Sequence, residues 1–130
     1  MPHYAQPGDA GADLRSSVDV IVPAQGRALV ATGVSLALPE GYVGLVHPRS
    51  GLALNHGITV LNTPGTIDAG YRGEVKVTLY NTSMDPFQVS TGDRIAQLVV
   101  QEVARAIFVL VERLPDSHRG TSGYGSTGKT

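Results

Sequence analysis

Short segments of alternating or mostly apolar residues recur along the chain, and most of them end at or near Gly, Pro or Asn. The clearest is Val75–Tyr80, where β-branched residues alternate with others, as in a strand with one buried face. Spaced in this way, such segments predict an all-β sandwich, jelly roll or barrel. The further predicted strands are Val18–Val22, Arg27–Ala31, Val34–Leu38 (divided from the preceding one by Thr32-Gly33), Tyr42–Val46, Ile58–Leu61, Phe87–Val89, Arg94–Val99 and Ala106–Val111.

Two segments depart from this strand pattern. Ser50–Asn55 predicts one short helix, although its apolar positions could equally belong to a buried loop. Pro115–Thr130 is rich in Gly, Ser and Thr and has almost nothing apolar apart from Tyr124. Such a segment cannot bury enough surface to offset its ordering entropy, so we expect a flexible Gly-rich tail. We therefore predict a β domain over residues 1–114 and a separate C-terminal segment over residues 115–130, for which a tail without a role is the alternative.

The composition indicates a small, turn-rich domain and excludes several kinds of site. The chain has 130 residues, with 16 Gly, 8 Pro and no Cys, which excludes disulfides, thiolate nucleophiles and Cys-based zinc sites. A net charge of −1 without blocks of like charge argues against a nucleic-acid or membrane surface. We find neither an apolar run of transmembrane length nor a signal peptide, so we expect a cytoplasmic protein.

Four internal stretches combine small and charged residues in a way that a plain β-sandwich does not need. Arg49-Ser50-Gly51 suits an anion, because Arg offers two parallel donors, Ser a hydroxyl, and Gly close access to backbone N–H groups. A turn with a surface arginine is the alternative interpretation. The four stretches are Ala10–Ser16, His47–Ala53, Asn62–Glu74 and Gly92–Leu98.

Four further residues in these stretches could carry chemistry. Asp68 could accept a proton from water, and Asp13 could support a metal ion, but each could also be a turn aspartate that caps its own backbone. Tyr71 could stack on a sugar or a base, or plug the edge of the sandwich. Asn62 could pair with a nucleobase or fix the turn before Pro64.

The histidines and the tail each suggest a site that we reject. No spacing typical of metal ligands relates His3, His47, His56 and His118, which we interpret as surface or structural residues. Gly123–Thr130 matches the Walker A pattern, but that pattern works between a strand and a helix, and here a polar tail precedes it. Glycines, hydroxyls and cations in the tail could still wrap a phosphate, with Arg119 as the charge partner.

The four stretches, followed by Arg119–Gly128, resemble the five ordered motifs of the trimeric dUTPases. The resemblance extends from Ala10 to Gly128, and the block Gly65–Glu74 is its most specific part. It implies a distorted jelly-roll-like β fold that hydrolyses dUTP to dUMP and pyrophosphate, supplying dUMP for dTTP synthesis and keeping uracil out of DNA. It further implies a homotrimer with active sites at subunit interfaces, in which the tail closes over a site as a lid.

The resemblance also implies a role for each site residue. Asp68 is the catalytic base that orients water for attack at the α-phosphate, and Asp13 supports Mg²⁺ through its water shell. The implied phosphate-side contacts are Arg49, Ser50, Gly51, Gln97, Arg119 and Ser126. The implied nucleoside contacts are Asn62, the backbone of Thr66, Ile67 and Asp68, and the rings of Tyr71 and Tyr124. Lys76, Gly123 and Gly125 complete the substrate-binding set.

Two features depart from the family pattern. Tyr124 stands where the family often has Phe, so we expect the stacking to survive with an added hydroxyl. Family members usually carry a further strand before the segment that corresponds to Pro2–Asp9. We expect this strand to be missing here, which bears on the sheet and the trimer more than on the chemistry.

Three other functions fit the sequence less well. A dCTP deaminase of the same fold needs a catalytic Glu where Thr78 stands, and a hydroxyl cannot replace the carboxylate in proton transfer. A non-catalytic nucleotide-binding module would need neither Asp68 nor the tail. A jelly-roll interaction protein without a ligand leaves the Gly-rich tail and the Arg and Asp turns unexplained.

Overall fold

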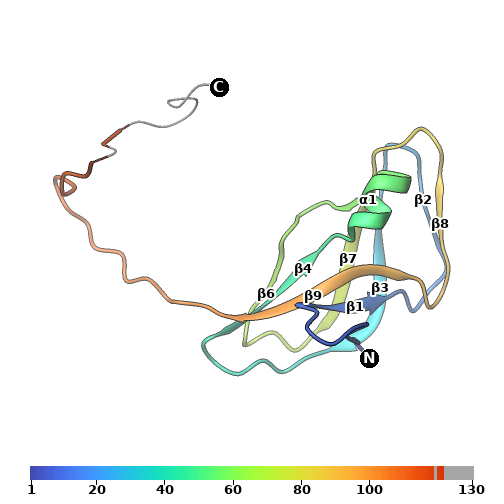
Figure 1. Ribbon diagram of the computed structural model, residues 1–130, viewed down its shortest axis with the longest axis horizontal. Helices are drawn as coiled ribbons and strands as arrows, with labels where there is room; N and C mark the ends of the chain where they lie inside the picture. Colours follow the sequence, from blue (N-terminus) through green and yellow to red (C-terminus); the bar gives the residue numbers. More distant parts are fainter. Residues whose placement is uncertain (119, 122–130) are drawn as a thin grey trace.

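The computed structural model describes residues 1–118, 120 and 121, and this part of the chain forms an all-β domain with one short helix (Figure 1). All of its strand pairs are antiparallel. The strands are β1 (Gly11–Arg15), β2 (Val20–Val22), β3 (Arg27–Ser35), β4 (Tyr42–His47), β5 (Ile58–Val60), β6 (Gly65–Ile67), β7 (Glu74–Asn81), β8 (Phe87–Val89) and β9 (Arg94–Glu102), with the helix α1 (Ser50–His56) between β4 and β5.

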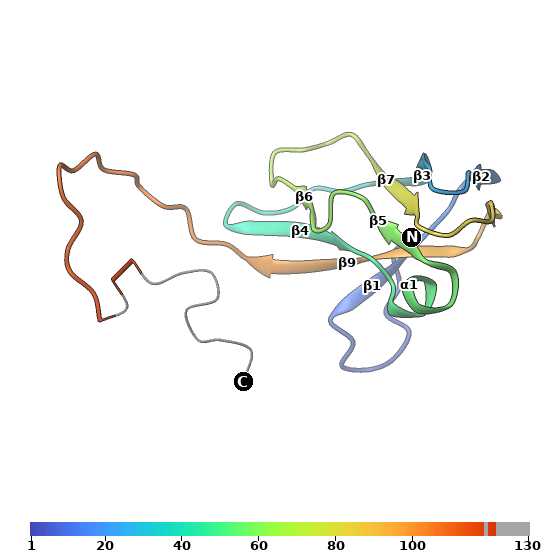
Figure 2. The same ribbon diagram turned by 90° about the horizontal axis from the view of Figure 1, so that it is seen from above.

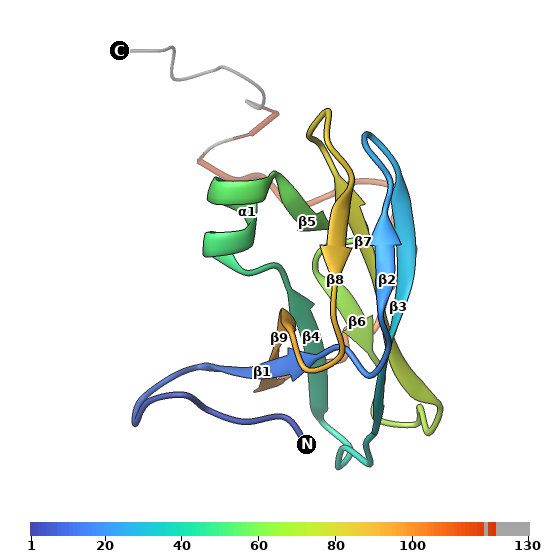
Figure 3. The same ribbon diagram turned by 90° about the vertical axis from the view of Figure 1, so that its right-hand side faces the viewer.

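The strands form three hydrogen-bonded sheets. Their orders are β1-β9-β4-β6, β3-β7-β5 and β2-β8. Within the described residues these sheets do not join into a closed barrel, so the jelly-roll-like fold is an open sandwich of sheets. In Figure 3, β2 and β8 stand next to β3, while α1 lies on the side of the domain near β5.

The core lies between the sheets and consists almost wholly of aliphatic side chains. Val75, Val77 and Leu79 of β7 are buried, whereas Lys76 between them is exposed, which confirms the predicted alternation. Leu14 is 0% exposed, and burying such a side chain contributes about 1.5–3 kcal/mol. The core members are Leu14, Val22, Val30, Val46, Ile58, Val60, Ile67, Val75, Val77, Leu79, Val89, Ile95, Ala96 and Leu98.

The predicted break at Thr32-Gly33 is wrong, because β3 runs through it as one strand with an irregularity. The Thr32 hydroxyl donates a hydrogen bond to the Val75 carbonyl at 2.5 Å and accepts one from the Val34 N–H at 3.2 Å. Gly33 takes φ +68°, which favours glycine. The pair therefore forms a bulge within a strand and not a turn between two strands.

Two strands, β1 and β6, lie in stretches that looked like turns in the sequence. β1 pairs with β9, with Ala12 opposite Leu98 and Asp13 opposite Gln97. β6 pairs with β4, with Thr66 opposite Leu45. Both strands are short and contain glycine, so their local pattern is weak, and pairing with a longer strand holds them in the sheet.

The predicted strand Ala106–Val111 is also wrong for the single chain. After β9 ends at Glu102, the backbone continues without regular structure and leaves the domain (Figure 2). Its apolar side chains stay open to solvent, with Phe108 94% and Leu110 99% exposed. Val103–Leu114 is called the C-terminal arm below. The Val103 N–H donates a hydrogen bond to the Gly41 carbonyl at 2.8 Å, and beyond Val103 the backbone of the arm has no such partner within the described part of its own chain. A strand needs a partner for its hydrogen bonds, so this pattern alone does not form one.

The predicted helix at Ser50–Asn55 is confirmed as α1, which extends to His56. Gly57 ends it in the left-handed conformation, with φ +65°. No helix among the residues that the structure describes is long and apolar enough to cross a membrane. A cytoplasmic location stays a prediction from the sequence.

Candidate functional site

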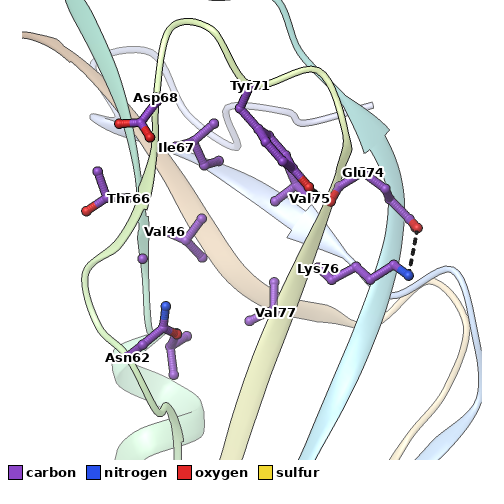
Figure 4. A pocket seen from close by; sticks show the side chains of 12 residues that line it. Val46, Asn62, Thr66, Ile67, Asp68, Tyr71, Glu74, Val75, Lys76 and Val77 are labelled. Carbon is purple, nitrogen blue, oxygen red and sulfur yellow. Dashed lines mark hydrogen bonds and ion pairs between the residues drawn. The ribbon is translucent and has the colours of Figure 1, made fainter.

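A pocket of about 210 Å³ lies beside the hairpin that joins β6 to β7 (Figure 4). Its wall is formed by core-facing valines, and its rim carries polar and aromatic side chains. An apolar cavity with a few polar groups at its edge suits a flat heterocycle or a sugar. The lining residues are Val46, Val60, Asn62, Gly65, Thr66, Ile67, Asp68, Tyr71, Glu74, Val75, Lys76 and Val77.

Gly65 allows two walls of this pocket to come close together. It lies opposite Val46 in the β4–β6 pair, and a Cβ atom at Gly65 would approach the Val46 Cβ to 3.4 Å and the Asn62 Nδ2 to 3.5 Å. Among the described residues, the Asn62 amide makes no hydrogen bond within the chain, so its donors and acceptor are free for a ligand.

Tyr71 forms one side of the pocket and is 46% exposed, so it does not plug the sandwich edge as a core residue. Its hydroxyl donates a hydrogen bond to the Glu74 carbonyl at 3.0 Å, and its backbone N–H donates one to the Asp68 carbonyl at 3.0 Å. Both ends of the residue are therefore tied to the hairpin, which leaves one ring face toward the cavity in Figure 4.

Successive side chains along β6 and into the hairpin point to opposite sides of the chain. Figure 4 shows the side chains of Thr66 and Asp68 leaving the strand on the side away from Tyr71, whereas Ile67 points toward it. Thr66 and Asp68 are exposed, and Ile67 is buried. The pocket is therefore open to the backbone of the hairpin, while the Asp68 carboxylate faces the opposite side.

Lys76 lines the pocket mainly with its stem, because its ammonium group is turned toward Glu74. The Lys76 Nζ lies 3.6 Å from Glu74 Oε2, and Glu74 Oε1 accepts a hydrogen bond from the Gly33 N–H at 2.9 Å. In Figure 4 this ion pair lies on the far side of the pocket from Asp68. Reaching a ligand would require Lys76 to leave Glu74.

A second pocket, of about 340 Å³, brings together three of the four stretches that the sequence singled out. They meet because β9 pairs with β1 on one side and with β4 on the other. Its lining is rich in charged and small residues, as an anion with a metal ion would need. The lining residues are Ala5, Asp9, Ala10, Gly11, Asp13, Arg49, Ser50, Gly51, Arg94 and Gln97.

Asp13 is the electrostatic centre of the second pocket. Its side chain is 14% exposed and lies between two guanidinium groups, with Oδ1 3.5 Å from Arg49 Nε and Oδ2 3.3 Å from Arg94 Nη1. Asp13 is a strand residue paired with Gln97, so the interpretation as a turn former is wrong. Arg94 is a site residue that the sequence prediction missed, because nothing in the chain near Arg94 indicates that it faces Asp13.

Gln97 lies next to Asp13 and is held by two neighbours. Its Nε2 donates a hydrogen bond to the Pro48 carbonyl at 3.0 Å, and its Oε1 lies over Gly11, where a Cβ atom would collide with it. Ser50 and Gly51 begin α1 beside this amide, and a Cβ atom at Gly51 would meet nothing within 4 Å. The first turn of α1 is therefore open to a ligand at the second pocket.

The two aspartates with expected roles lie far apart in one chain. The β-sheet register places Asp68 level with Gln101 of β9, and Asp13 level with Gln97, on the same face of the sheet. Between them lie three strand spacings of about 4.8 Å and four residues of about 3.3 Å each, which corresponds to a separation of roughly 19 Å. The two pockets have no lining residue in common.

The remaining predicted site residues lie outside the described part of the chain. They are Arg119, Gly123, Tyr124, Gly125 and Ser126. Within the described residues, no group of three or more His, Cys, Asp or Glu side chains could enclose a metal ion, and none of the four histidines lines either pocket. His3, His56 and His118 are exposed, and His47 is half-buried on β4. A metal ion at the second pocket would therefore take most of its ligands from water and from a substrate.

The comparisons agree with one another about what this chain is similar to. A family model described as dUTPase matches residues 1–128. The deoxyuridine 5'-triphosphate nucleotidohydrolase of Leifsonia xyli subsp. xyli is 59% identical over 131 residues, covering 100% of this chain and 86% of that protein. The enzyme of the same name from Thermobifida fusca is 59% identical over 129 residues, covering 98% of this chain and 72% of that protein.

Solved structures share the fold. The Staphylococcus bacteriophage 80alpha dUTPase with dUpNHpp has a TM-score of 0.92 and 30% identity, covering 98% of this chain and 91% of that one. A mutant dUTPase from phage phi11 of S. aureus, described as revealing the coordination of a structural Mg(II) ion, has a TM-score of 0.81 and 29% identity, covering 87% and 90% of the two chains.

Proposed function

The chain belongs to the dUTPase family and is an enzyme that hydrolyses dUTP, and from this premise we propose that each of its catalytic sites combines the two pockets of neighbouring copies in a homotrimer. The observation that carries the proposal is the register of the sheet, which, extended one residue past β6, separates the backbone positions of Asp68 and Asp13 by roughly 19 Å from strand spacing and rise. Groups that act on one phosphate must lie within hydrogen-bond reach of it or one water away.

Within a single chain, Asp68 and the Asp13–Arg49 pair cannot meet at one α-phosphate across that distance. The Asp68 carboxylate leaves β6 on the face away from the nucleoside-sized pocket, where a neighbouring copy would find it. If the second pocket of another copy lies against that face, its Asp13 and Arg49 come within reach of the same phosphate as Asp68. A closed trimer makes three equivalent sites of this kind, because each copy then offers one pocket to each neighbour.

In this site the first pocket binds the deoxyuridine. The open backbone of Thr66, Ile67 and Asp68 and the free amide of Asn62 offer donors and acceptors that match uracil. Cytosine would leave buried polar groups unpaired, at a cost of about 1–3 kcal/mol each. The ring of Tyr71 packs on the deoxyribose and leaves no room for a 2′-hydroxyl, and Lys76 contributes a further contact after it leaves Glu74.

The second pocket binds the phosphates. Arg49 supplies a bidentate cation, Ser50 a hydroxyl and Gly51 an accessible backbone N–H, with the Gln97 amide beside them. Asp68 of the adjoining copy then accepts a proton from a water molecule and orients that water for attack at the α-phosphate, in line with the departing pyrophosphate. Catalysis here is alignment and charge neutralisation, so the chain needs no nucleophilic side chain of its own.

The second pocket also fits Mg²⁺. Asp13 would hold the ion through water, since both of its oxygens already face arginines and the described residues offer no larger carboxylate cluster nearby. Mg²⁺ keeps several waters and binds readily through one carboxylate and substrate phosphates. When bound, it supplies positive charge that neutralises the triphosphate.

The C-terminal arm supports assembly of several copies. Six large apolar residues of the arm from Ile107 onward are solvent-exposed in the single chain, which is costly in water and is relieved when another copy covers them. An extended arm can also pair its backbone with a neighbouring sheet edge. These residues are Ile107, Phe108, Val109, Leu110, Val111 and Leu114.

We further propose that residues 115–130 close over a site as a lid. Arg119 and Ser126 would bind the γ-phosphate side, Tyr124 would stack over the base, and Gly123 and Gly125 would let the backbone approach the phosphates. A lid that excludes water strengthens every ionic contact beneath it. The related phage enzyme described with dUpNHpp supports a triphosphate as the ligand of such a site.

Mixing two inactive variants tests the shared site. Asp68→Asn removes the base that the copy with the first pocket contributes, Arg49→Ala removes the phosphate-binding cation of the second pocket, and each homotrimer should be inactive. If each site draws on two copies, co-expression should restore activity, because random association leaves about one quarter of the sites intact. A mixture as inactive as its components would mean that one chain builds the whole site.

A nucleotide panel tests the reaction itself. Pyrophosphate release should be measured with dUTP, dCTP, dTTP and UTP, each with Mg²⁺ and with EDTA. We expect turnover of dUTP alone, and loss of that turnover in EDTA. Equal turnover with and without EDTA would contradict the role given to Mg²⁺ and Asp13.

A further inference from the structure

Gly73 lies against the ring of Tyr71 in the hairpin between β6 and β7. A Cβ atom at Gly73 would collide with the Tyr71 hydroxyl oxygen and would lie 2.7 Å from Cζ and 3.0 Å from Cε2. Gly73 is not among the glycines with positive φ, so its backbone conformation is open to other residues. The Tyr71 ring therefore occupies the space that a side chain at residue 73 would need.

The ring that occupies this space is held in a defined position. The Tyr71 hydroxyl reaches across Gly73 to donate its hydrogen bond to the Glu74 carbonyl at 3.0 Å. The ring thus lies back along the hairpin, over residues 73 and 74, and its other face borders the pocket. A side chain at residue 73 would lift the ring from this support and break its bond to Glu74.

We propose that Gly73 is a specificity-determining positioning residue, which fixes the distance between the Tyr71 ring and the sugar by leaving room for the ring to lie back. The proposal rests on the proposed contact of Tyr71 with the deoxyribose. Ribose differs from deoxyribose by one hydroxyl, so its exclusion depends on how closely the ring approaches the sugar. A ring lifted from its support moves toward solvent and no longer holds this close approach, which admits the hydroxyl and lowers the preference for dUTP over UTP.

A side chain at residue 73 should displace the Tyr71 ring without destabilising the fold. The colliding atoms are the far end of the Tyr71 side chain, which is 46% exposed and can move toward solvent. Gly73→Ala should therefore fold and assemble as the parent does. Gly70→Ala is the matched control, because Gly70 lies in the same hairpin, lacks positive φ, and has nothing within 4 Å of its Cβ position.

The test compares kcat/KM for dUTP and for UTP, with thermal unfolding measured alongside. Gly73→Ala should lower the dUTP-to-UTP ratio by about tenfold, the effect expected when a pocket wall shifts by about one methylene group. Gly70→Ala should keep the parental ratio, and both variants should keep the parental unfolding midpoint. A parental ratio in Gly73→Ala would overturn the proposal.

A double variant separates this proposal from the role of Tyr71 itself. The Tyr71→Ala variant has no ring to displace. The double variant with Gly73→Ala should therefore have the same dUTP-to-UTP ratio of kcat/KM as Tyr71→Ala alone. If Gly73→Ala lowered the ratio equally in both backgrounds, it would act by another route and the proposal would fail. If Tyr71→Ala itself kept the parental ratio, the sugar contact in the proposed function would be wrong, which is a different result.

Discussion

The Nε atom of Arg49 lies 3.5 Å from Oδ1 of Asp13, so the cation proposed to bind phosphate is already paired with the carboxylate proposed to support Mg²⁺. At 3.5 Å this contact is longer than a charge-assisted hydrogen bond, which measures about 2.7–2.9 Å. A triphosphate can therefore draw Arg49 away at little cost. Arg94, 3.3 Å from Oδ2, keeps Asp13 oriented while Arg49 moves.

Asp13→Asn should separate metal support from phosphate binding. The amide keeps the size of the side chain but loses the charge, so the Mg²⁺ concentration for half-maximal activity should rise about 10–100-fold. Calorimetry in EDTA should show dUTP binding at least as tightly as to the parent, because Arg49 is released. An unchanged Mg²⁺ requirement would mean that Asp13 only anchors the arginines.

Asp68→Asn should keep substrate binding and lose turnover. The amide cannot accept a proton from water, and positioned general bases contribute about 10²–10⁴-fold to rate. Binding of dUpNHpp should match the parent, because only the backbone of residue 68 borders the nucleoside pocket in Figure 4. Asp85→Asn, outside both site pockets, is the control and should keep full activity. Parental turnover in Asp68→Asn would remove it from the mechanism.

Leu110→Asp in the C-terminal arm should weaken assembly without unfolding the subunit. Leu110 is 99% exposed in the single chain, so a charge there costs nothing until another copy covers the arm. Light scattering during size-exclusion chromatography should show dissociation, with activity lost in parallel. The comparison is Met84→Asp, at an exposed site of the β7–β8 turn, which should stay assembled. A stable, active trimer from the Leu110 variant would show that the arm is dispensable.

Removal of Arg119–Thr130 should leave a folded trimer with little activity. The β domain keeps its sheets without this segment, so circular dichroism and the unfolding midpoint should match the full chain. The proposed γ-phosphate contacts and the cover over the site are lost together, which lowers kcat/KM. Full activity after truncation would refute the lid, and an unfolded product would make the segment structural.

Asp19 predicts one pH dependence of stability. The backbone N–H of Thr91, at 2.6 Å from Oδ1, and secondarily the Thr91 hydroxyl, lower the pKa of Asp19 below its usual 3.8. A depressed carboxyl pKa stabilises the fold above pH 3.8, and this contribution is lost as the pH falls through the lower folded value. The difference in urea stability between parent and Asp19→Ala should therefore be full at pH 6 and shrink below pH 4 or so.

Thr91→Val provides the matched comparison for Asp19. It removes the hydroxyl and keeps the backbone donor, which is the larger cause of the pKa shift. Thr91→Val should therefore remove the smaller part of the pH-dependent stability that Asp19 contributes. A stability difference between parent and Asp19→Ala that did not change between pH 6 and strongly acidic solution would show that the Thr91 contact does not favour the ionised carboxyl.

The sequence by itself determined the fold class, most of the strand positions and the chemistry available. The alternation in Val75–Tyr80 can bury one face only as a strand, and the helix at Ser50 has its Gly57 stop nearby. The residue types of the four stretches already indicated anion, metal and nucleobase contacts. Such features are local, because each depends on side chains within a few residues of one another.

Tertiary structure alone decided which of these residues meet. β1 and β6 were unrecognisable locally and exist because β9 and β4 supply their hydrogen bonds, and the same pairing brings Arg94 to Asp13. Conversely, the segment Ala106–Val111 has a strand-like pattern but finds no partner in the described part of its own chain. A strand needs hydrogen bonds from residues far along the chain or from another copy, and a local pattern carries no information about which partner is present.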